Sequence, residues 1–447
     1  MNMPLMKSKD LPLLKCQAEA LPWVLDRDRA ILGIGTGLGK TRVMLETFRY
    51  RKLMGDVKSM IIISPLRVAQ LTWPDEVKKW APEMKCSFMP REGWMWDDNV
   101  DIYVLNYEMV PRLMKMIKAT KRCPANMVVL DECQCAKSPS AKRMQMLRPL
   151  LCKAGYVYGM TGTPSGNGYG DLYGQFKAIF QEKSPFPTLG QFERDYILKD
   201  PYKKWSQFFN PDRLHEFLHK IRPYMITQKA SEFLDLPDIE YIDVRVPLGD
   251  ELMERYKELE KELIAEIQGK EITAVSAGVL VGKLQQFTSG KIFYEDEVGE
   301  KRVVDVHDKK TVAVLKVAKI ERPLLIIKNY THTHVPGAEP FSEELVAKWN
   351  RREVPMMIGH PKSVGIGLNL QAGGSAICWY TPSYSLNDTM QTEARLYRTG
   401  QEEQVRVYRL ICPGTVDEAV IEAVKAKERG QNVLMTALRY IKAQAKR

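Results

Sequence analysis

A glycine-rich loop near the start of the chain has the residue types that hold a phosphate chain. The sequence GTGLGKT at residues 35 to 41 follows a short apolar run and precedes a segment of helical composition. Because Gly37 and Gly39 lack a Cβ, backbone N–H groups can turn toward phosphate oxygens at this loop. The Lys40 ammonium would then meet the β and γ phosphates, and the Thr41 hydroxyl would bind Mg²⁺. The loop therefore predicts a nucleoside triphosphate site.

One position departs from the general pattern of phosphate loops, G-x4-G-K-[ST]. The pattern requires glycine where the chain has Ile34. The neighbouring segments still supply a strand, a loop and a helix in that order, and the helix N-terminus adds a positive dipole. Taken alone, the loop could also be a flexible connection without a ligand.

A pair of acidic residues follows a second apolar run. In VVLDECQ, residues 128 to 134, the apolar residues predict a buried parallel strand whose carboxyl end carries Asp131 and Glu132. Open α/β sheets bind ligands at this edge. Asp131 would hold Mg²⁺, and Glu132 would orient and deprotonate the attacking water. An acidic pair is also common in solvated turns, so only its combination with the loop at 35 to 41 favours a site.

Composition and charge restrict the class of protein. The chain has 447 residues, enough for two or three domains, with 45% hydrophobic and 27% charged residues. The formal net charge of +11 favours a polyanionic partner. Residues 423 to 447 hold seven basic side chains against one acidic, which suits a contact with a phosphate backbone or a solubilising end.

The cysteines and the hydropathy of the sequence predict the cellular compartment of the protein. The eight cysteines are scattered without a C-x-x-C pair, which is typical of reduced thiols in a cytosolic protein. Neither a signal sequence nor an apolar run long enough for a bilayer is present, so we expect no membrane partner. We expect the protein in the cytoplasm, and in that of the host cell if the chain is viral.

Short apolar runs alternate with helical stretches in both halves of the chain. This alternation predicts an α/β fold with parallel sheets and right-handed crossovers. In the first half the predicted strands are 30 to 33, 60 to 64, 101 to 105, 127 to 130 and 156 to 160. In the second half they are 323 to 328, 354 to 358, 375 to 380 and 405 to 410. Two α/β cores are the simplest account of this pattern.

The stretch between the two cores differs in composition. Residues 202 to 289 look helical, with apolar residues at helical spacing and many Glu and Lys residues between 253 and 268. Residues 291 to 306 predict two strands around a turn at Val298 and Gly299. We interpret the region from about 250 to 306 as helical and hairpin insertions carried on the two cores.

Several further blocks accompany the loop and the acidic pair in a fixed order. They are CQAEALPWVL (16 to 25), IIISPLRVAQLTWPDEVKKW (61 to 80), VLNYEM (104 to 109), TGTPSGNGYGDLYGQF (161 to 176), HPKSVGIGLNLQAGG (360 to 374) and QTEARLYRTGQ (391 to 401). Over nearly its whole length, the chain thereby resembles the Swi/Snf branch of superfamily 2 helicase-like ATPases, particularly the compact versions found in phages. The resemblance implies two RecA-like lobes, residues 1 to 235 and 236 to 447, with ATP and Mg²⁺ between them.

The resemblance also assigns further residues to the nucleotide. It places Gln17 on the base and implies contacts from Gly367 and Gln391. It gives Arg395 and Arg398 to the departing γ phosphate, where positive charge stabilises the transition state. Their i, i+3 spacing predicts one shared helix face. Because both would come from the second lobe, hydrolysis would require the lobes to close.

Nucleic-acid contacts and coupling residues follow from the same blocks. The resemblance implies backbone contacts from Arg67, Lys78, Lys79 and Asn106, although each one alone is better explained as an ordinary surface residue. The residues expected to couple the nucleotide site to the nucleic acid are Gln134, Thr161, Thr163 and Asn167. Gln134 stands where the family has a histidine, so this position keeps a hydrogen-bonding side chain that cannot titrate.

These observations together predict an ATP-dependent translocase on duplex DNA that remodels branched DNA or DNA–protein complexes. Aromatic residues are not interleaved with basic residues in any one stretch, which argues against a single-strand stacking platform. A strand-separating helicase on DNA or RNA stays open as an alternative. A third alternative is an ATP-gated binding scaffold with little turnover. Its discriminating feature would be a missing catalytic residue, and Lys40, Asp131, Glu132, Arg395 and Arg398 are all present.

Overall fold

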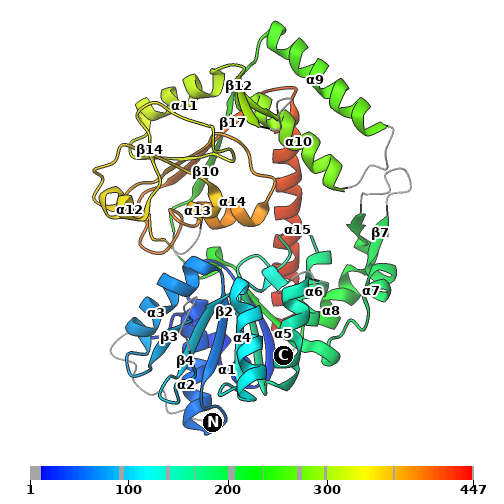
Figure 1. Ribbon diagram of the computed structural model, residues 1–447, viewed down its shortest axis with the longest axis vertical. Coiled ribbons are helices and arrows are strands. Elements are labelled where there is room, and N and C mark those ends of the chain that lie inside the picture. The colour runs from blue at the N-terminus through cyan, green and yellow to red at the C-terminus, as the bar shows by residue number, and fades with distance from the viewer. Residues whose placement is uncertain are drawn as a thin grey trace. The chain divides into compact units, whose positions relative to one another are not determined.

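The computed structural model describes residues 12–89, 95–136, 141–166, 168–199, 207–234, 236–268, 274–295, 300–365 and 368–444. Contacts divide the chain into two compact units (Figure 1). Unit 1 comprises Met1–Leu198, Phe208–Leu234 and Arg429–Arg447, and unit 2 comprises Lys199–Gln207 and Asp235–Glu428. The division that we expected after residue 235 stays a prediction. Among the described residues, no helix has the length and apolar character that a membrane crossing requires.

Unit 1 is built on a seven-stranded parallel sheet. Its strands lie in the order β3 (Cys86–Phe88), β4 (Ile102–Asn106), β2 (Met60–Ser64), β5 (Met127–Asp131), β6 (Tyr156–Thr161), β1 (Arg29–Ile34) and β9 (Met225–Gln228). The five strands predicted in this half are confirmed. The sequence did not reveal β3 and β9, because strands of 3 and 4 residues are too short to show a period.

Helices cover both faces of this sheet, and each face has its own core. The helices of unit 1 are α1 (Lys15–Leu25), α2 (Lys40–Leu53), α3 (Trp73–Trp80), α4 (Val110–Thr120), α5 (Lys142–Lys153), α6 (Gly170–Phe180), α7 (Leu189–Tyr196) and α8 (Leu214–Ile221). Side chains of α1, α2 and α3 pack with Leu32 on one face. Those of α4 to α8 pack with Ile31 on the other, because successive strand residues point to opposite faces. A short strand, β7 (Ile197–Lys199), pairs with β8 (Gln207–Phe209).

Unit 2 contains a six-stranded parallel sheet. The strands lie in the order β10 (Ile239–Arg245), β17 (Val405–Ile411), β16 (Ala376–Trp379), β13 (Leu324–Ile327), β15 (Met356–Gly359) and β14 (Glu339–Pro340). The helices are α9 (Asp250–Gln268), α10 (Ala274–Thr288), α11 (Lys309–Ile320), α12 (Glu343–Asn350), α13 (Pro361–Val364), α14 (Leu386–Glu393) and the first part of α15 (Val416–Gln444), whose residues from Arg429 on belong to unit 1. The four strands predicted in this half are confirmed, so the fold has two parallel α/β sheets.

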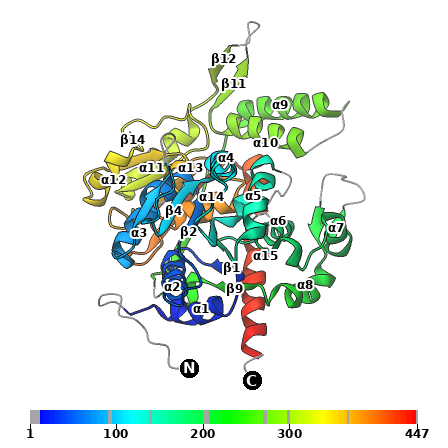
Figure 2. The same ribbon diagram turned by 60° about the horizontal axis from the view of Figure 1, so that its bottom comes forward.

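The insertion in unit 2 consists of a helical pair and a hairpin. Helices α9 and α10 lie side by side, next to the antiparallel strands β11 (Lys291–Glu295) and β12 (Lys301–Asp305) (Figure 2). The two strands confirm the predicted hairpin, while its expected turn at Val298 and Gly299 lies outside the described residues. The expectation that residues 202 to 289 are helical was wrong in part. Strands β8, β9 and β10 lie in this range, and β10 was missed because several exposed charged residues interrupt its apolar ones.

Candidate nucleotide site

The glycine-rich loop connects β1 to α2 at the carboxyl edge of the sheet in unit 1. Gly37 and Gly39 have φ angles of 86° and 73°, a left-handed conformation that favours glycine. Gly39 caps α2 and supplies no side chain to the first helical N–H groups, which suits an anion at this end. The Lys40 Nζ donates to the Ile34 carbonyl oxygen at 2.9 Å, and Thr41 follows in the first turn. The loop therefore has the backbone that a phosphate cradle needs.

Ile34 explains why the general pattern of phosphate loops is incomplete. Its side chain is 1% exposed and belongs to the core beneath α1, α2 and α3. The residue that departs from the pattern thus ends strand β1 and packs in the core. The turn into the loop begins one residue later, at Gly35, whose N–H donates to the Gln228 carbonyl oxygen at 2.8 Å.

Gln17 packs directly against the loop from α1. Its Nε2 donates to the Leu38 carbonyl oxygen at 3.2 Å, and its Oε1 accepts from the Leu14 N–H at 3.1 Å. A Cβ on Gly39 would lie 2.2 Å from Gln17 Nε2, so a larger residue at this position would displace the Gln17 amide. The structure brings Gln17 to the loop, as expected of a residue that reads the base, and its contact with a base stays a prediction.

The acidic pair lies at the same edge, at the end of β5. Asp131 Oδ2 accepts hydrogen bonds from the Ser64 hydroxyl at 3.1 Å and from the Trp73 indole N–H at 2.9 Å. Burial, followed by repulsion from Glu132, raises the Asp131 pKa to about 6, whereas Trp73 and Lys40 oppose the rise. A buried carboxylate that the Lys40 charge can reach fits a bound Mg²⁺, whose preferred ligands are oxygens.

Glu132 has an unusual backbone for a residue with a side chain. Its φ angle is 50°, and strained geometry of this kind gathers at functional sites. Its Oε2 accepts a hydrogen bond from the Gln134 Nε2 at 2.6 Å. Gln134, which stands where the resemblance predicts histidine, therefore binds the Glu132 carboxylate. The backbone of the preceding residue is also held, because the Tyr107 hydroxyl donates to the Asp131 carbonyl oxygen at 2.9 Å.

Two residues around Asp131 were missed in the sequence. Trp73 is 0% exposed and begins α3, directly after a π-helical turn, η1 (Val68–Thr72). Such turns are rare and often occur at functional sites. Ser64 ends β2 and is also fully buried. The available signal was the position of both residues inside the block 61 to 80, which the resemblance assigns to the nucleic acid alone.

The segment after β6 reaches the glycine-rich loop. The Thr163 N–H donates to the Thr161 hydroxyl at 3.0 Å, and both residues are buried. A Cβ on Gly162 would lie 3.0 Å from Thr36 Oγ1 and 3.7 Å from Lys40 Nζ. Thr161 and Thr163 thus flank a point of contact with the loop, whereas Asn167 lies outside the described residues.

The four residues expected to contact nucleic acid are not gathered in one place. Arg67 follows β2 and Asn106 ends β4, both at the carboxyl edge. Asn106 is 6% exposed, and its Nδ2 donates to Glu108 Oε2 at 2.8 Å. Lys78 and Lys79 are exposed on the last turn of α3, which leads away from that edge. Contacts from these residues to a nucleic acid stay predictions.

The arginine segment in unit 2 differs from the expected helix. Helix α14 ends at Glu393, so Arg395 and Arg398 lie in the turns that follow and share no helix face. They are brought together by a backbone group instead, because both donate to the Leu368 carbonyl oxygen, at 3.1 and 3.2 Å. The Arg395 Nε also donates to the Gln391 carbonyl oxygen at 3.0 Å. Gly367 lies outside the described residues.

Gln401 holds this segment in its irregular shape. Its Nε2 donates to the carbonyl oxygens of Gln371, Gly374 and Leu396, at 3.3, 3.0 and 3.2 Å. One buried amide therefore ties the two blocks 360 to 374 and 391 to 401 together within unit 2. This explains why glutamine ends the second block.

A glycine-rich loop with Lys-Thr, beside an Asp-Glu pair whose aspartate is buried at the carboxyl edge of a parallel sheet, defines a P-loop nucleoside triphosphatase. The family model of the SNF2-related domain matches residues 16–289, which is more than half of the chain. The chain therefore belongs to the SNF2-related family, as its motifs predicted, and is an ATP hydrolase of that family.

Individual relatives are distant. The chain is 26% identical to "Putative protein p41" of Acyrthosiphon pisum secondary endosymbiont phage 1, over 93% of this chain and 96% of that protein. It is 25% identical to "Putative ATP-dependent helicase/translocase YwqA" of Bacillus subtilis, over 89% of this chain and 46% of that protein. The chain thus spans less than half of the Bacillus protein. A solved SWI2/SNF2 ATPase core of Sulfolobus solfataricus in complex with dsDNA aligns over 98% of this chain and 97% of that one, with 19% identity and a TM-score of 0.47.

Proposed function

We propose that the chain is a DNA-dependent ATPase that moves along duplex DNA and remodels branched DNA or DNA–protein complexes. The observation that carries this proposal is the preformed site of unit 1, where the phosphate loop, Lys40, Asp131 and Glu132 meet at one sheet edge. Two comparisons support movement on DNA: the match to the SNF2-related family, and the similarity to the Bacillus protein named as a putative ATP-dependent helicase/translocase.

The roles of the residues in unit 1 follow from their chemistry. The N–H groups of the loop and the Lys40 ammonium bind the β and γ phosphates of ATP. Gln17 would read the base, and Thr41 and Asp131 would hold Mg²⁺, which would supply positive charge to the transferring phosphate. Glu132 orients the attacking water and accepts its proton, while Gln134 keeps the Glu132 carboxylate in place.

The arginines complete this chemistry. Arg395 and Arg398 stabilise the negative charge that develops on the γ phosphate as its bond to the leaving group lengthens. Both donate to the Leu368 carbonyl oxygen in unit 2, so each would exchange this partner for phosphate oxygens during catalysis. Gln391 and Gly367 are further candidates for contacts with the nucleotide.

The track is duplex DNA, held through its phosphate backbone. The net charge of +11 and the exposed side chains of Lys78 and Lys79 support a polyanionic partner. Because such contacts carry no sequence information, binding is expected to be salt-sensitive and weakly sequence-specific. Thr161, Thr163 and Gln134 link the track to the nucleotide through the loop.

A strand-displacement assay distinguishes this function from strand separation. A third strand bound in the major groove of a duplex is displaced by a motor that tracks along that duplex, whereas a tailed duplex is opened by a helicase that separates strands. We expect displacement of the third strand with ATP and no unwinding of the tailed duplex. Unwinding of the tailed duplex without displacement of the third strand would contradict the proposal and favour a strand-separating helicase.

A further inference from the structure

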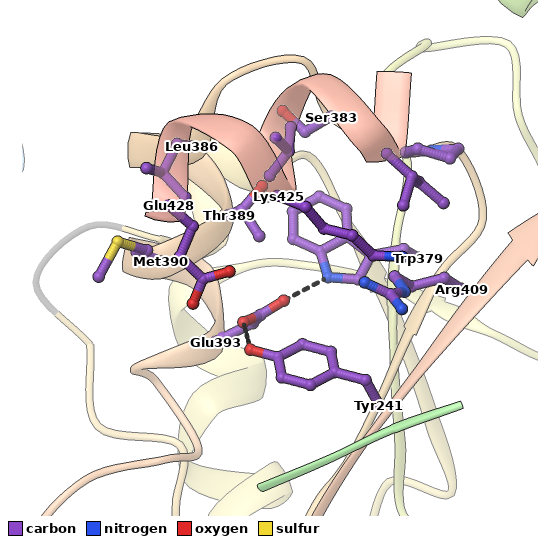
Figure 3. Close-up of a pocket in the computed structure, with 13 residues that line it drawn as sticks. Tyr241, Trp379, Ser383, Leu386, Thr389, Met390, Glu393, Arg409, Lys425 and Glu428 are labelled. Carbon is purple, nitrogen blue, oxygen red and sulfur yellow. Dashed lines mark hydrogen bonds between the residues drawn. The ribbon is translucent and has the colours of Figure 1, made fainter. Parts of the chain in front are cut away.

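Unit 2 contains a cavity of ≈ 270 Å³ between its sheet and two helices (Figure 3). The sheet supplies the floor. Arg409 on β17 is the register partner of both Trp379 on β16 and Asp243 on β10, so these side chains share one face. Tyr241, two residues before Asp243, lies on the same face and borders the cavity.

Two helices supply the walls with residues at helical spacing. Leu386, Met390 and Glu393 lie on one side of α14, and Val424 and Glu428 lie on one side of α15. The cavity is therefore an apolar pocket whose lining includes carboxylates from two helices. Ligand pockets usually combine apolar walls with a few placed polar groups in this way.

The buried polar group is the Glu393 carboxylate. Glu393 is 6% exposed, and its two oxygens accept from the Tyr241 hydroxyl at 2.9 Å and from the Trp379 indole N–H at 3.1 Å (Figure 3). Because each carboxylate oxygen can accept two hydrogen bonds, both keep accepting capacity. Glu428 lines the cavity with Glu393, and the repulsion between the two is one cause, after burial, of a raised Glu393 pKa.

The two basic residues of the lining already have acidic partners outside it. Arg409 Nε lies 2.6 Å from Asp243 Oδ1, and Lys425 Nζ lies 3.0 Å from Glu422 Oε1. Among the described residues, no ion pair involves Glu428. Because Arg409 and Lys425 are each balanced by an acidic partner, Glu393 and Glu428 leave a net negative charge at the cavity. A complementary ligand carries a positive charge.

We propose that this cavity binds a small organic cation, an amine with an apolar body. The ammonium group lies between Glu393 and Glu428, and donates to their carboxylate oxygens. The apolar body packs against Leu386 and Met390, and the Trp379 ring adds cation–π attraction. The size fits a ligand of this kind, since the volume is close to the lower end of the range for drug-sized sites. Binding of a cation at this cavity does not depend on the proposed function, so it is measured directly and not through ATP turnover.

Three small molecules that share a benzyl group and differ in charge test the proposal. Phenethylamine is cationic, 2-phenylethanol is neutral and phenylacetate is anionic. Calorimetric titration of the full chain at pH 8, above the Glu393 pKa of about 7, keeps that carboxylate ionised. We expect saturable binding of phenethylamine with a Kd below about 1 mM, at least about tenfold tighter than 2-phenylethanol, and no binding of phenylacetate. Equal binding of all three probes, or no saturable binding of phenethylamine, would overturn the proposal.

Variants locate the binding. Glu428→Gln is expected to weaken phenethylamine at least about fivefold and to leave 2-phenylethanol unchanged, because it removes one charge at constant shape. Val424→Trp, which fills the cavity, should abolish binding of both. Glu344→Gln, an exposed acid on α12, is the matched control and should behave as the unmodified chain. Phenethylamine binding unchanged in Glu428→Gln would refute the site even if Val424→Trp failed to fold.

Discussion

The two regions that carry the predicted nucleotide chemistry are built in opposite ways. In unit 1, Asp131 and Glu132 stand at the end of a strand and are held by Ser64, Trp73 and Gln134. In unit 2, Arg395 and Arg398 lie in irregular turns and donate to one backbone carbonyl. Under the proposed mechanism, the first region is preformed for its ligand, whereas the arginines of the second must release the Leu368 carbonyl oxygen before they bind phosphate.

This difference predicts that the two regions affect different kinetic constants. Residues of the preformed site should change nucleotide and metal binding as well as turnover. The arginines should change turnover, because they meet the phosphate only when charge develops on it. The variants below test this distinction.

The largest effect is expected for Arg395→Ala. Loss of an arginine at the transferring phosphate should lower kcat about 10³-fold while the affinity for ATP changes little. Steady-state ATP hydrolysis and titration with a fluorescent ATP analogue measure the two quantities. Arg395→Lys retains the charge without the planar fork and should recover part of the rate.

Arg351→Ala is the matched control, since this arginine is exposed and forms an ion pair with nearby Glu353. Its rate should equal that of the unmodified chain. If Arg395→Ala lowered ATP affinity as much as turnover, the contrast between the two regions would be wrong.

Glu132→Gln should lower kcat about 10²-fold to 10³-fold, because the amide cannot accept the proton of the attacking water. ATP should still bind and remain uncleaved, which a filter-binding assay with labelled ATP detects. Glu19→Gln, an exposed acid on α1, serves as the control. Hydrolysis at the normal rate in Glu132→Gln would remove Glu132 from the catalytic role.

Trp73→Phe tests whether the surroundings of Asp131 are part of the site. The variant keeps the ring in the core but deletes the indole N–H that Asp131 accepts at 2.9 Å. We expect the Mg²⁺ concentration for half-maximal hydrolysis to rise about tenfold, as when a partner of a metal ligand is lost. Trp80→Phe, which deletes an indole bond to Glu76 on the same helix, should leave the Mg²⁺ requirement unchanged.

The smallest effect concerns stability and pH. Burial and then Glu132 raise the Asp131 pKa from 3.8 to about 6, so folding favours the protonated carboxyl. This contribution is fully present below pH 3.8 and is lost as the pH rises through about 6. The shift corresponds to roughly 3 kcal/mol at neutral pH without Mg²⁺.

Asp131→Asn should therefore gain stability over the unmodified chain as the pH rises from 4 to 8. Thermal unfolding of both proteins in a chelator, at several pH values, measures the difference. Asp75→Asn, an exposed acid on α3, should show no such trend. A difference that is constant with pH would mean that Asp131 is not the buried titrating group.

The sequence predicted the residues whose roles depend on local order along the chain. The loop between β1 and α2, and the acidic pair after β5, were found because a strand, a turn and a chemical group adjoin in sequence. The surroundings of Asp131 could not be found in this way. Ser64 lies on the neighbouring strand β2 and Trp73 begins α3, so both are distant from Asp131 in sequence and contact it in the folded chain. The conformation of the arginines was predicted wrongly, since their i, i+3 spacing suits a helix while Gln401 stabilises turns.

Edge and insertion elements were the least predictable parts of the fold. The four residues of β9 become a strand because β1 offers a free edge, and nothing in their own pattern reveals it. Strand β10 carries exposed charged residues between its apolar ones and pairs with β17 over seven residues. By contrast, the central strands are buried on both faces and were identifiable as short apolar runs.

The most direct test of the central claim is the rate of ATP hydrolysis with and without duplex DNA, in the unmodified chain and in Lys40→Ala. The account predicts that duplex DNA raises the rate of the unmodified chain at least about tenfold, and that Lys40→Ala lowers the stimulated rate by about 10²-fold or more. A chain whose hydrolysis ignores duplex DNA, or a Lys40→Ala variant that keeps the stimulated rate, would contradict it.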